Sequence, residues 1–131
     1  RMIGMDLARE YSLLEAGLPR FINFDKEFPG KDALLKQQEQ GLPLNYVTLE
    51  VDVTDADPLG SEPIFHNGTM IGRGTSGAYG HTVEKSLSLG YVPPEFAPVG
   101  TELEVEILGE RRPARVIPES PCDPENLKLR A

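Results

Sequence analysis

The chain has 131 residues, of which 39% are hydrophobic and 26% are charged, and it carries a net charge of −8. This length fits one domain with a sizeable core. No apolar run approaches the length that spans a membrane, and the acidic balance argues against a nucleic-acid partner, whose phosphates select basic surfaces. The single cysteine, Cys122, can form no internal disulfide, which favours a reducing compartment and predicts a cytoplasmic protein.

The first thirty residues combine short, mixed signals. A turn of helix is expected before Pro19, which together with Gly17 limits its length, and a short strand or extended segment is expected over Phe21–Phe24. If a further domain packs against this side, the apolar residues should be exposed or covered by a neighbouring copy. These residues are Leu13, Leu14, Leu18, Phe21 and Phe24.

The clearest helix is predicted over Lys31–Gln40, a run of strong helix formers. Asp32 lies near its positive N-terminal end, and Gly41 is placed to end it. Three consecutive residues are expected to supply its buried side, namely Ala33, Leu34 and Leu35.

Beyond Gly41 the pattern becomes that of strands. Polar and apolar residues alternate from Tyr46 to Val53, which predicts a strand with one buried face, and a polar loop follows it. Asn67-Gly68 then separates two short apolar runs and tolerates positive φ at both positions, so we predict a type I′ hairpin. Four glycines come next, where bulges, turns or near backbone contacts exclude a Cβ. They are Gly72, Gly74, Gly77 and Gly80.

Three more strand signals complete the pattern. One runs from Leu87 to Val92, a second alternates over residues 102–107, and a turn at Gly109-Glu110 leads to a third over residues 113–117. One early helix followed by five or six closely spaced strands fits a small antiparallel barrel or sandwich with an N-terminal helical segment. Of the two we predict a mainly β fold built as a Greek-key-like barrel. We expect a joining segment over residues 1–41 and the barrel over residues 42–131.

No set of residues indicates catalysis or metal binding. His66 and His81 lie far from Cys122 in sequence, and we expect both to be surface or turn residues. The glycines do not form a phosphate loop, because Glu84 stands where that motif needs a glycine before Lys85. The remaining charges are expected to be solvated or to protect strand edges. They are Asp52, Asp55 and Asp57, Glu102, Glu104 and Glu106, and Arg111 and Arg112.

Several motifs nevertheless occur in an order that resembles a known family. They are Gly4-x-Asp6-Leu7, Leu14-Glu15-Ala16-Gly17-Leu18, Gly60-x-Glu62-Pro63-Ile64, Thr75-Ser76-Gly77-x-Tyr79-Gly80, Ser86-x-x-x-Gly90-Tyr91-Val92-Pro93 and Pro121-x-Asp123-Pro124. Nearly the whole chain resembles the C-terminal barrel of the folate-dependent aminomethyltransferase family, which includes the glycine-cleavage T-protein. The details look closest to the sarcosine and dimethylglycine dehydrogenases.

The resemblance implies one part of a larger enzyme. In this family a folate-binding region, which contains the acidic residue of one-carbon transfer, precedes the barrel, and in the dehydrogenase branch an FAD-binding half lies further upstream. The resemblance therefore implies tetrahydrofolate, possible FAD, a methylated-amine substrate and a missing folate-binding domain as cofactors and partners of the parent. It also implies a mitochondrial matrix location if the source is eukaryotic, and it assigns no catalytic residue to this chain.

Loops at the ends of barrels often meet ligands, so we expect the barrel to wall the folate pocket. The expected wall residues are Thr75, Ser76 and Tyr79, with the tail 121–126 as a second candidate. The alternative reading makes Tyr79 and Tyr91 core or rim aromatics. A tyrosine typical of T-proteins near the C-terminus is replaced by Leu127 here.

Two hypotheses remain open. The favoured one is a C-terminal barrel that is inactive alone and binds no tetrahydrofolate tightly, the chain opening at Arg1 because a preceding segment is missing. The alternative is a self-sufficient binding or interaction module that uses the same barrel.

Overall fold

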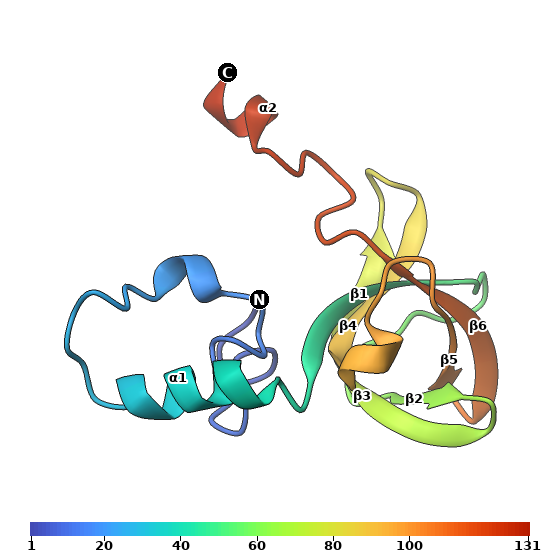
Figure 1. Ribbon diagram of the computed structural model, residues 1–131. Coiled ribbons are helices and arrows are strands. Elements are labelled where there is room, and N and C mark those ends of the chain that lie inside the picture. Colours follow the sequence, from blue (N-terminus) through green and yellow to red (C-terminus); the bar gives the residue numbers. More distant parts are fainter.

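The computed structural model describes residues 1–131, and six antiparallel strands close into a barrel in the order β1-β4-β3-β2-β5-β6 (Figure 1). The chain passes between non-neighbouring strands from β1 to β2 and from β4 to β5, so the connectivity is Greek-key-like. The predicted mainly β barrel is therefore confirmed. The strands are β1 Asn45–Val51, β2 Pro63–His66, β3 Thr69–Gly80, β4 Lys85–Val92, β5 Glu102–Ile107 and β6 Glu110–Ile117.

The barrel interior is filled by alternating apolar residues. Leu49, Ile64 and Val105 are wholly buried there, and each such side chain stabilises the fold by about 1.5–3 kcal/mol relative to exposure. The predicted inward alternation is confirmed for β1 and β5, but Thr48, placed on the predicted polar face, is also buried. The remaining core residues are Val47, Val51, Val92, Leu103, Ile107, Ala114 and Val116.

Two tight hairpins set the strand register. Asn67 and Gly68 have φ of 48° and 81°, so both predicted positive values are confirmed between β2 and β3. Between β5 and β6 the turn residues are Leu108 and Gly109, with φ of 52° and 83°, one position earlier than predicted. The difference arises because Ile107 pairs with Glu110, which already belongs to β6.

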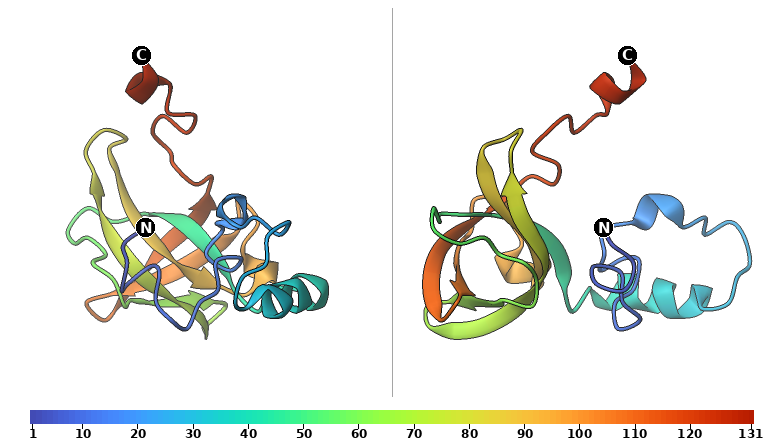
Figure 2. Two further views of the ribbon diagram at one scale, coloured as in Figure 1. Left: turned by 90° about the vertical axis from the view of Figure 1, so that its left-hand side faces the viewer. Right: turned by 180° about the vertical axis from the view of Figure 1, so that it is seen from behind.

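The predicted glycine positions lie in one long strand rather than in successive turns. β3 carries a register shift between Gly74 and Ser76, which confirms a bulge. A Cβ on Gly77 would lie 2.6 Å from the carbonyl oxygen of Pro58, which crosses over the strand there. Beyond the barrel wall, β3 and β4 continue as a projecting hairpin (Figure 2).

The joining segment, residues 1–41, lies beside the barrel and contains α1 at Lys31–Gln40, as predicted (Figure 1). No strand forms over Phe21–Phe24. Phe21 belongs to a 3₁₀ turn that Pro19 starts, η1 Pro19–Phe21, and of the expected alternative, an extended segment, Ile22 is extended. The buried side expected for α1 is wrong for Ala33, whereas Leu34 and Leu35 are half-buried. Ala33 is exposed, and no residue of α1 is fully buried, since the helix does not lie on the barrel.

The apolar residues expected to form one side of the joining segment differ in burial. Leu14 and Leu18 are buried, whereas Leu13 and Phe21 are 42% and 67% exposed, and Phe24 is half-buried. None of the helices is both long and apolar enough to cross a membrane.

Two short elements remain outside the barrel wall. A 3₁₀ turn, η2 Pro94–Phe96, follows β4, and the tail beyond β6 leads away from the barrel to α2 at Leu127–Arg130 (Figure 1).

Candidate functional site

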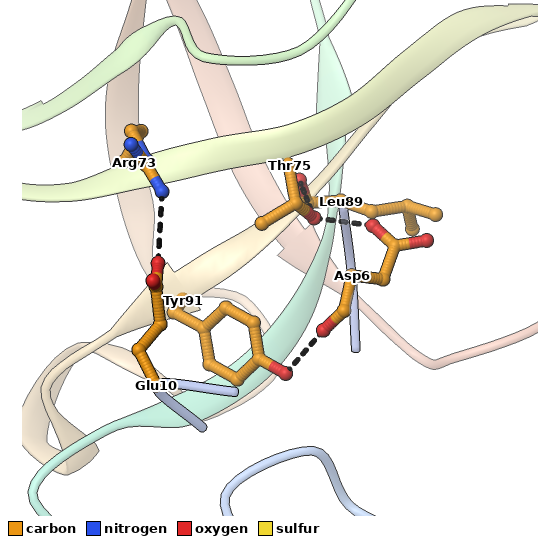
Figure 3. A network of polar contacts seen from close by, with 6 residues as sticks. All are labelled: Asp6, Glu10, Arg73, Thr75, Leu89 and Tyr91. Carbon is orange, nitrogen blue, oxygen red and sulfur yellow. Dashed lines mark hydrogen bonds and ion pairs between the residues drawn. The ribbon is translucent and has the colours of Figure 1, made fainter. Parts of the chain in front are cut away.

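A buried carboxylate joins the N-terminal residues to the barrel. Asp6, only 2% exposed, accepts hydrogen bonds from the Met2 backbone N–H at 2.7 Å, from the Ser76 hydroxyl at 2.8 Å and from the Thr75 hydroxyl. Its own carbonyl oxygen accepts from the Tyr91 hydroxyl at 2.7 Å (Figure 3). We call these four residues, Asp6, Thr75, Ser76 and Tyr91, the Asp6 clasp.

The ionisation states of the clasp follow from these contacts. Burial alone would raise the pKa of Asp6, but the hydrogen bonds from Thr75, Met2 and Ser76 outweigh it, so the pKa lies below its ordinary value. Burial, with Tyr11 nearby, raises the pKa of Tyr91 to about 12. At neutral pH the clasp therefore contains an ionised carboxylate, which only accepts, and a neutral phenol, which donates.

Aromatic rings extend the contact around Tyr91. The Tyr11 ring stacks on it with 3.7 Å between centroids, and Tyr46 meets it edge-on at 5.2 Å. The guanidinium of Arg1 lies 4.4 Å from the centroid of the Tyr46 ring, whose buried hydroxyl has no hydrogen-bond partner. Tyr91 is thus a core aromatic of a second small cluster, with Ala16 and Leu18 packed against it.

The three expected wall residues do not lie in one site. Thr75 is 4% exposed and, like Ser76, is engaged by Asp6. Tyr79 is 40% exposed on the projecting hairpin, where its ring meets His81 edge-on at 5.0 Å. The tail 121–126 leads away from the barrel and lines neither of two clefts of about 1320 and 910 Å³.

Sequence reasoning missed Asp6 as a member of this arrangement. Its motif, Gly4-x-Asp6-Leu7, contributes to the family resemblance alone, and no neighbouring residue distinguishes Asp6 from a solvated aspartate. The sequence offers one signal for this contact. The motif that contains Asp6 and the motif that contains Thr75 and Ser76 belong to the same family pattern, although Asp6 and Thr75 are 69 residues apart.

The larger cleft, about 1320 Å³, lies on the barrel and is strongly acidic. Lys85 and Arg115 are its basic residues, at 2.6 Å and 3.7 Å from the same oxygen of Glu50, and the Ser86 hydroxyl donates to Asp57 at 2.6 Å. Tyr79 and His81 line it as well. Its carboxylates are Glu50, Asp52, Asp55, Asp57, Glu84, Glu102 and Glu104.

The side chains that could bind a metal ion do not lie together. No group of three or more His, Cys, Asp or Glu side chains is arranged to hold a metal ion. His66 instead contacts the Glu102 carbonyl at 3.3 Å and the Asn67 amide nitrogen at 3.0 Å. Cys122 is exposed.

These arrangements differ in what they can do chemically. The Asp6 carboxylate has a low pKa and three donors on it, so it holds chain segments together rather than exchanging protons with a substrate. The acidic cleft presents negative charge to solvent and would repel a polyanionic ligand.

Comparisons with known proteins agree on one family. The model of the glycine cleavage T-protein C-terminal barrel domain matches residues 45–123. Human mitochondrial dimethylglycine dehydrogenase is 40% identical over 121 residues, which are 91% of this chain and 14% of that protein. An aminomethyltransferase from Desulfitobacterium hafniense is 38% identical over 118 residues, 89% of this chain and 32% of that protein.

A solved structure extends the likeness to three dimensions. The glycine cleavage system aminomethyltransferase T from Bartonella henselae superposes with a TM-score of 0.81 at 26% identity, covering 88% of this chain and 33% of that one. The chain therefore spans between about a seventh and a third of the length of these relatives.

Proposed function

The chain belongs to the family of the glycine cleavage T-protein C-terminal barrel domain, and we propose that it is the barrel of a folate-linked enzyme. In this proposal the parent is a methylated-amine dehydrogenase of the sarcosine or dimethylglycine type, or an aminomethyltransferase. The observation that carries it is the match to both kinds of enzyme through the joining segment as well as the barrel.

We assign the barrel the role of a wall. One-carbon transfer needs a pocket that holds folate and amine adduct together and excludes water, and a rigid closed barrel can supply one side of it. Tyr79 is the proposed wall residue that remains free to face a ligand. Thr75 and Ser76 would then stabilise the position of that wall and not contact the ligand, because their hydroxyls already donate to Asp6.

The proposal leaves folate binding and catalysis to other domains of the parent. The proposed partners are therefore an upstream folate-binding domain with tetrahydrofolate and a methylated amine, and, in the dehydrogenase branch, an FAD-binding half. If the source is eukaryotic, we propose a location in the mitochondrial matrix. The human relative is itself named as a mitochondrial protein.

A chimera tests the role of the barrel. The corresponding residues of human dimethylglycine dehydrogenase are replaced by this chain, and tetrahydrofolate-dependent one-carbon transfer is measured beside the dehydrogenase reaction. We expect the chimera to retain transfer, whereas the same enzyme truncated before the barrel should lose it. A chimera that is folded and oxidises its amine, but transfers no better than the truncated enzyme, would contradict the proposal.

Titration of the 131-residue chain with tetrahydrofolate separates this proposal from an independent binding module. We expect no saturable binding by the isolated chain, since the other walls of the pocket are supplied by the parent. A dissociation constant in the micromolar range or tighter would instead favour a self-sufficient module.

A further inference from the structure

The joining segment is attached to the barrel in two unequal parts. Residues 1–18 contact it repeatedly, because besides the Asp6 clasp the Tyr46 N–H donates to the Glu15 carbonyl at 2.9 Å and Arg73 lies 3.2 Å from Glu10. Residues 19–41 have no fully buried side chain. The side-chain hydrogen bond from α1 to residues 1–18 is Gln37 to Glu15, at 3.2 Å.

We propose that Asp6, Thr75 and Ser76 are positioning residues, which make residues 1–18 part of the folding unit of the barrel and leave residues 19–41 as a separate excursion. This inference rests on the proposed function for its consequence. The clasp would fix the direction in which the upstream folate-binding domain meets the barrel wall. The expected domain boundary between residues 41 and 42 is then replaced by two boundaries, one at each end of residues 19–41.

A buried carboxylate suits this role because its contacts form together or not at all. A buried ion without hydrogen-bond donors strongly destabilises a fold, whereas hydrogen bonds to a charged group are stronger than those between neutral groups. Moving residues 1–18 slightly would strip two hydroxyl donors from Asp6 at once. The clasp therefore holds one position, where apolar contact alone would tolerate sliding.

The excursion is bounded by backbone that permits a change of direction. Gly17, two residues before it begins, and Gly41, its last residue, have φ of 66° and 87°, a region that favours glycine. Figure 2 shows residues 19–41 as an open loop with α1 on one side, standing off the barrel. Its exchange with solvent should therefore be independent of the clasp.

Amide hydrogen exchange on the full 131-residue chain tests the proposal. Within residues 1–18, backbone bonds protect the amides of Asp6, Leu7, Ala16 and Leu18. We expect Thr75→Val, which keeps the shape and removes the hydroxyl, to speed their exchange about tenfold or more. Thr75→Ser keeps the donor and should restore most of the protection. Amides of β5 and β6 should change less than twofold in both variants.

Matched variants exclude a general loss of packing. Ser88→Ala removes a hydroxyl that is equally buried but has no partner, so it should leave exchange in residues 1–18 unchanged. Asp6→Asn should act like Thr75→Val. If Thr75→Val fails to fold, Ser76→Ala, at a half-buried position, provides the same measurement. Unchanged exchange in residues 1–18, or equal acceleration in β5 and β6, would overturn the proposal.

The chimera connects the clasp to function. If Thr75 positions the domains, Thr75→Val and Asp6→Asn should reduce transfer in parallel, and Thr75→Ser should rescue it. If Thr75 touches folate directly, Thr75→Val should raise the KM for tetrahydrofolate while Asp6→Asn does not, which would overturn the positioning role. Because exchange is measured without folate, an inactive parent chimera would count against the proposed function alone.

Discussion

The barrel and the joining segment are held by different forces. The barrel closes all its strands around ten buried apolar side chains, so its stability comes mainly from area removed from water. The joining segment has a small cluster around Tyr91, and its helix buries no residue fully. A buried carboxylate and its hydroxyl donors join residues 1–18 of this segment to the barrel. In this chain, apolar burial stabilises the barrel, and polar contacts orient the N-terminal residues that are attached to it.

Charge separates the two regions as well. Residues 1–41 contain seven acidic and six basic residues, whereas residues 42–131 contain fourteen acidic and seven basic ones. The net charge of the chain is therefore almost entirely that of the barrel and its tail. A nearly neutral segment with exposed Phe21 and Leu13 is better suited to packing against another protein surface than the acidic barrel is.

The largest effect should come from the apolar side of this comparison. Leu49→Ala, at a wholly buried position of β1, should lower the free energy of unfolding by about 3 kcal/mol, because it removes buried surface and leaves a cavity. Leu59→Ala, at a side chain 77% exposed, should change it by less than about 0.5 kcal/mol. Urea unfolding followed by far-ultraviolet circular dichroism measures both. Equal effects would show that burial does not decide the stability of the barrel.

Acid should destabilise the N-terminal residues before the barrel, with a smaller change in free energy than Leu49→Ala causes. The pKa of Asp6 is lowered from its ordinary 3.8, so its contribution is complete above that value and is lost as pH falls through the lower, folded-state value. Residues 1–18 should therefore lose amide protection below pH 3.8, before β5 and β6 do.

Asp6→Asn isolates the contribution of the clasp to this acid transition. The pKa of Glu119 is also lowered, by a hydrogen bond from Arg1, so part of the transition should persist in the variant. A transition identical in the wild-type chain and in Asp6→Asn would exclude the clasp as its cause. Two-dimensional NMR at stepwise lower pH follows both regions in one sample.

The smallest effect concerns the two hairpins inside the barrel. Leu108 is 91% exposed and has φ of 52°, a region that a leucine rarely adopts, whereas Asn67 occupies the matching position of the other hairpin at 48°. Leu108→Asn should raise the free energy of unfolding by about 0.5–1 kcal/mol, and Asn67→Leu should lower it by a similar amount. Denaturant midpoints compare them. A loss of stability in Leu108→Asn would mean that the side chain makes a contact worth more than the backbone strain.

Local patterns predicted the elements that neighbouring residues control. The helix over Lys31–Gln40 follows from its run of helix formers, and the β2–β3 hairpin follows from the backbone freedom of Asn67-Gly68. The predictions failed where a distant contact or a single proline decided the outcome. Pro19 starts a 3₁₀ turn that includes Phe21, so no strand forms over Phe21–Phe24, and Ala33 is exposed because α1 stands off the barrel.

The candidate site was predictable only in part. Thr75, Ser76 and Tyr79 could be selected by their motif, but a motif does not say which way each side chain faces. The bulge between Gly74 and Ser76 changes that direction, so the two hydroxyls face Asp6 while Tyr79 lies out on the hairpin.

The sequence by itself determined a mainly β chain with one early helix, because the periods of apolar residues and the backbone preferences of glycine, proline and asparagine act over a few residues. It also carried the ordered motifs through which its family could be recognised. Only the tertiary structure decided that Asp6 meets Thr75 and Ser76, since that contact exists only after the barrel has closed and β3 and β4 present their outer face. Such a contact between residues 69 positions apart depends on the path of the whole chain, which no local pattern contains.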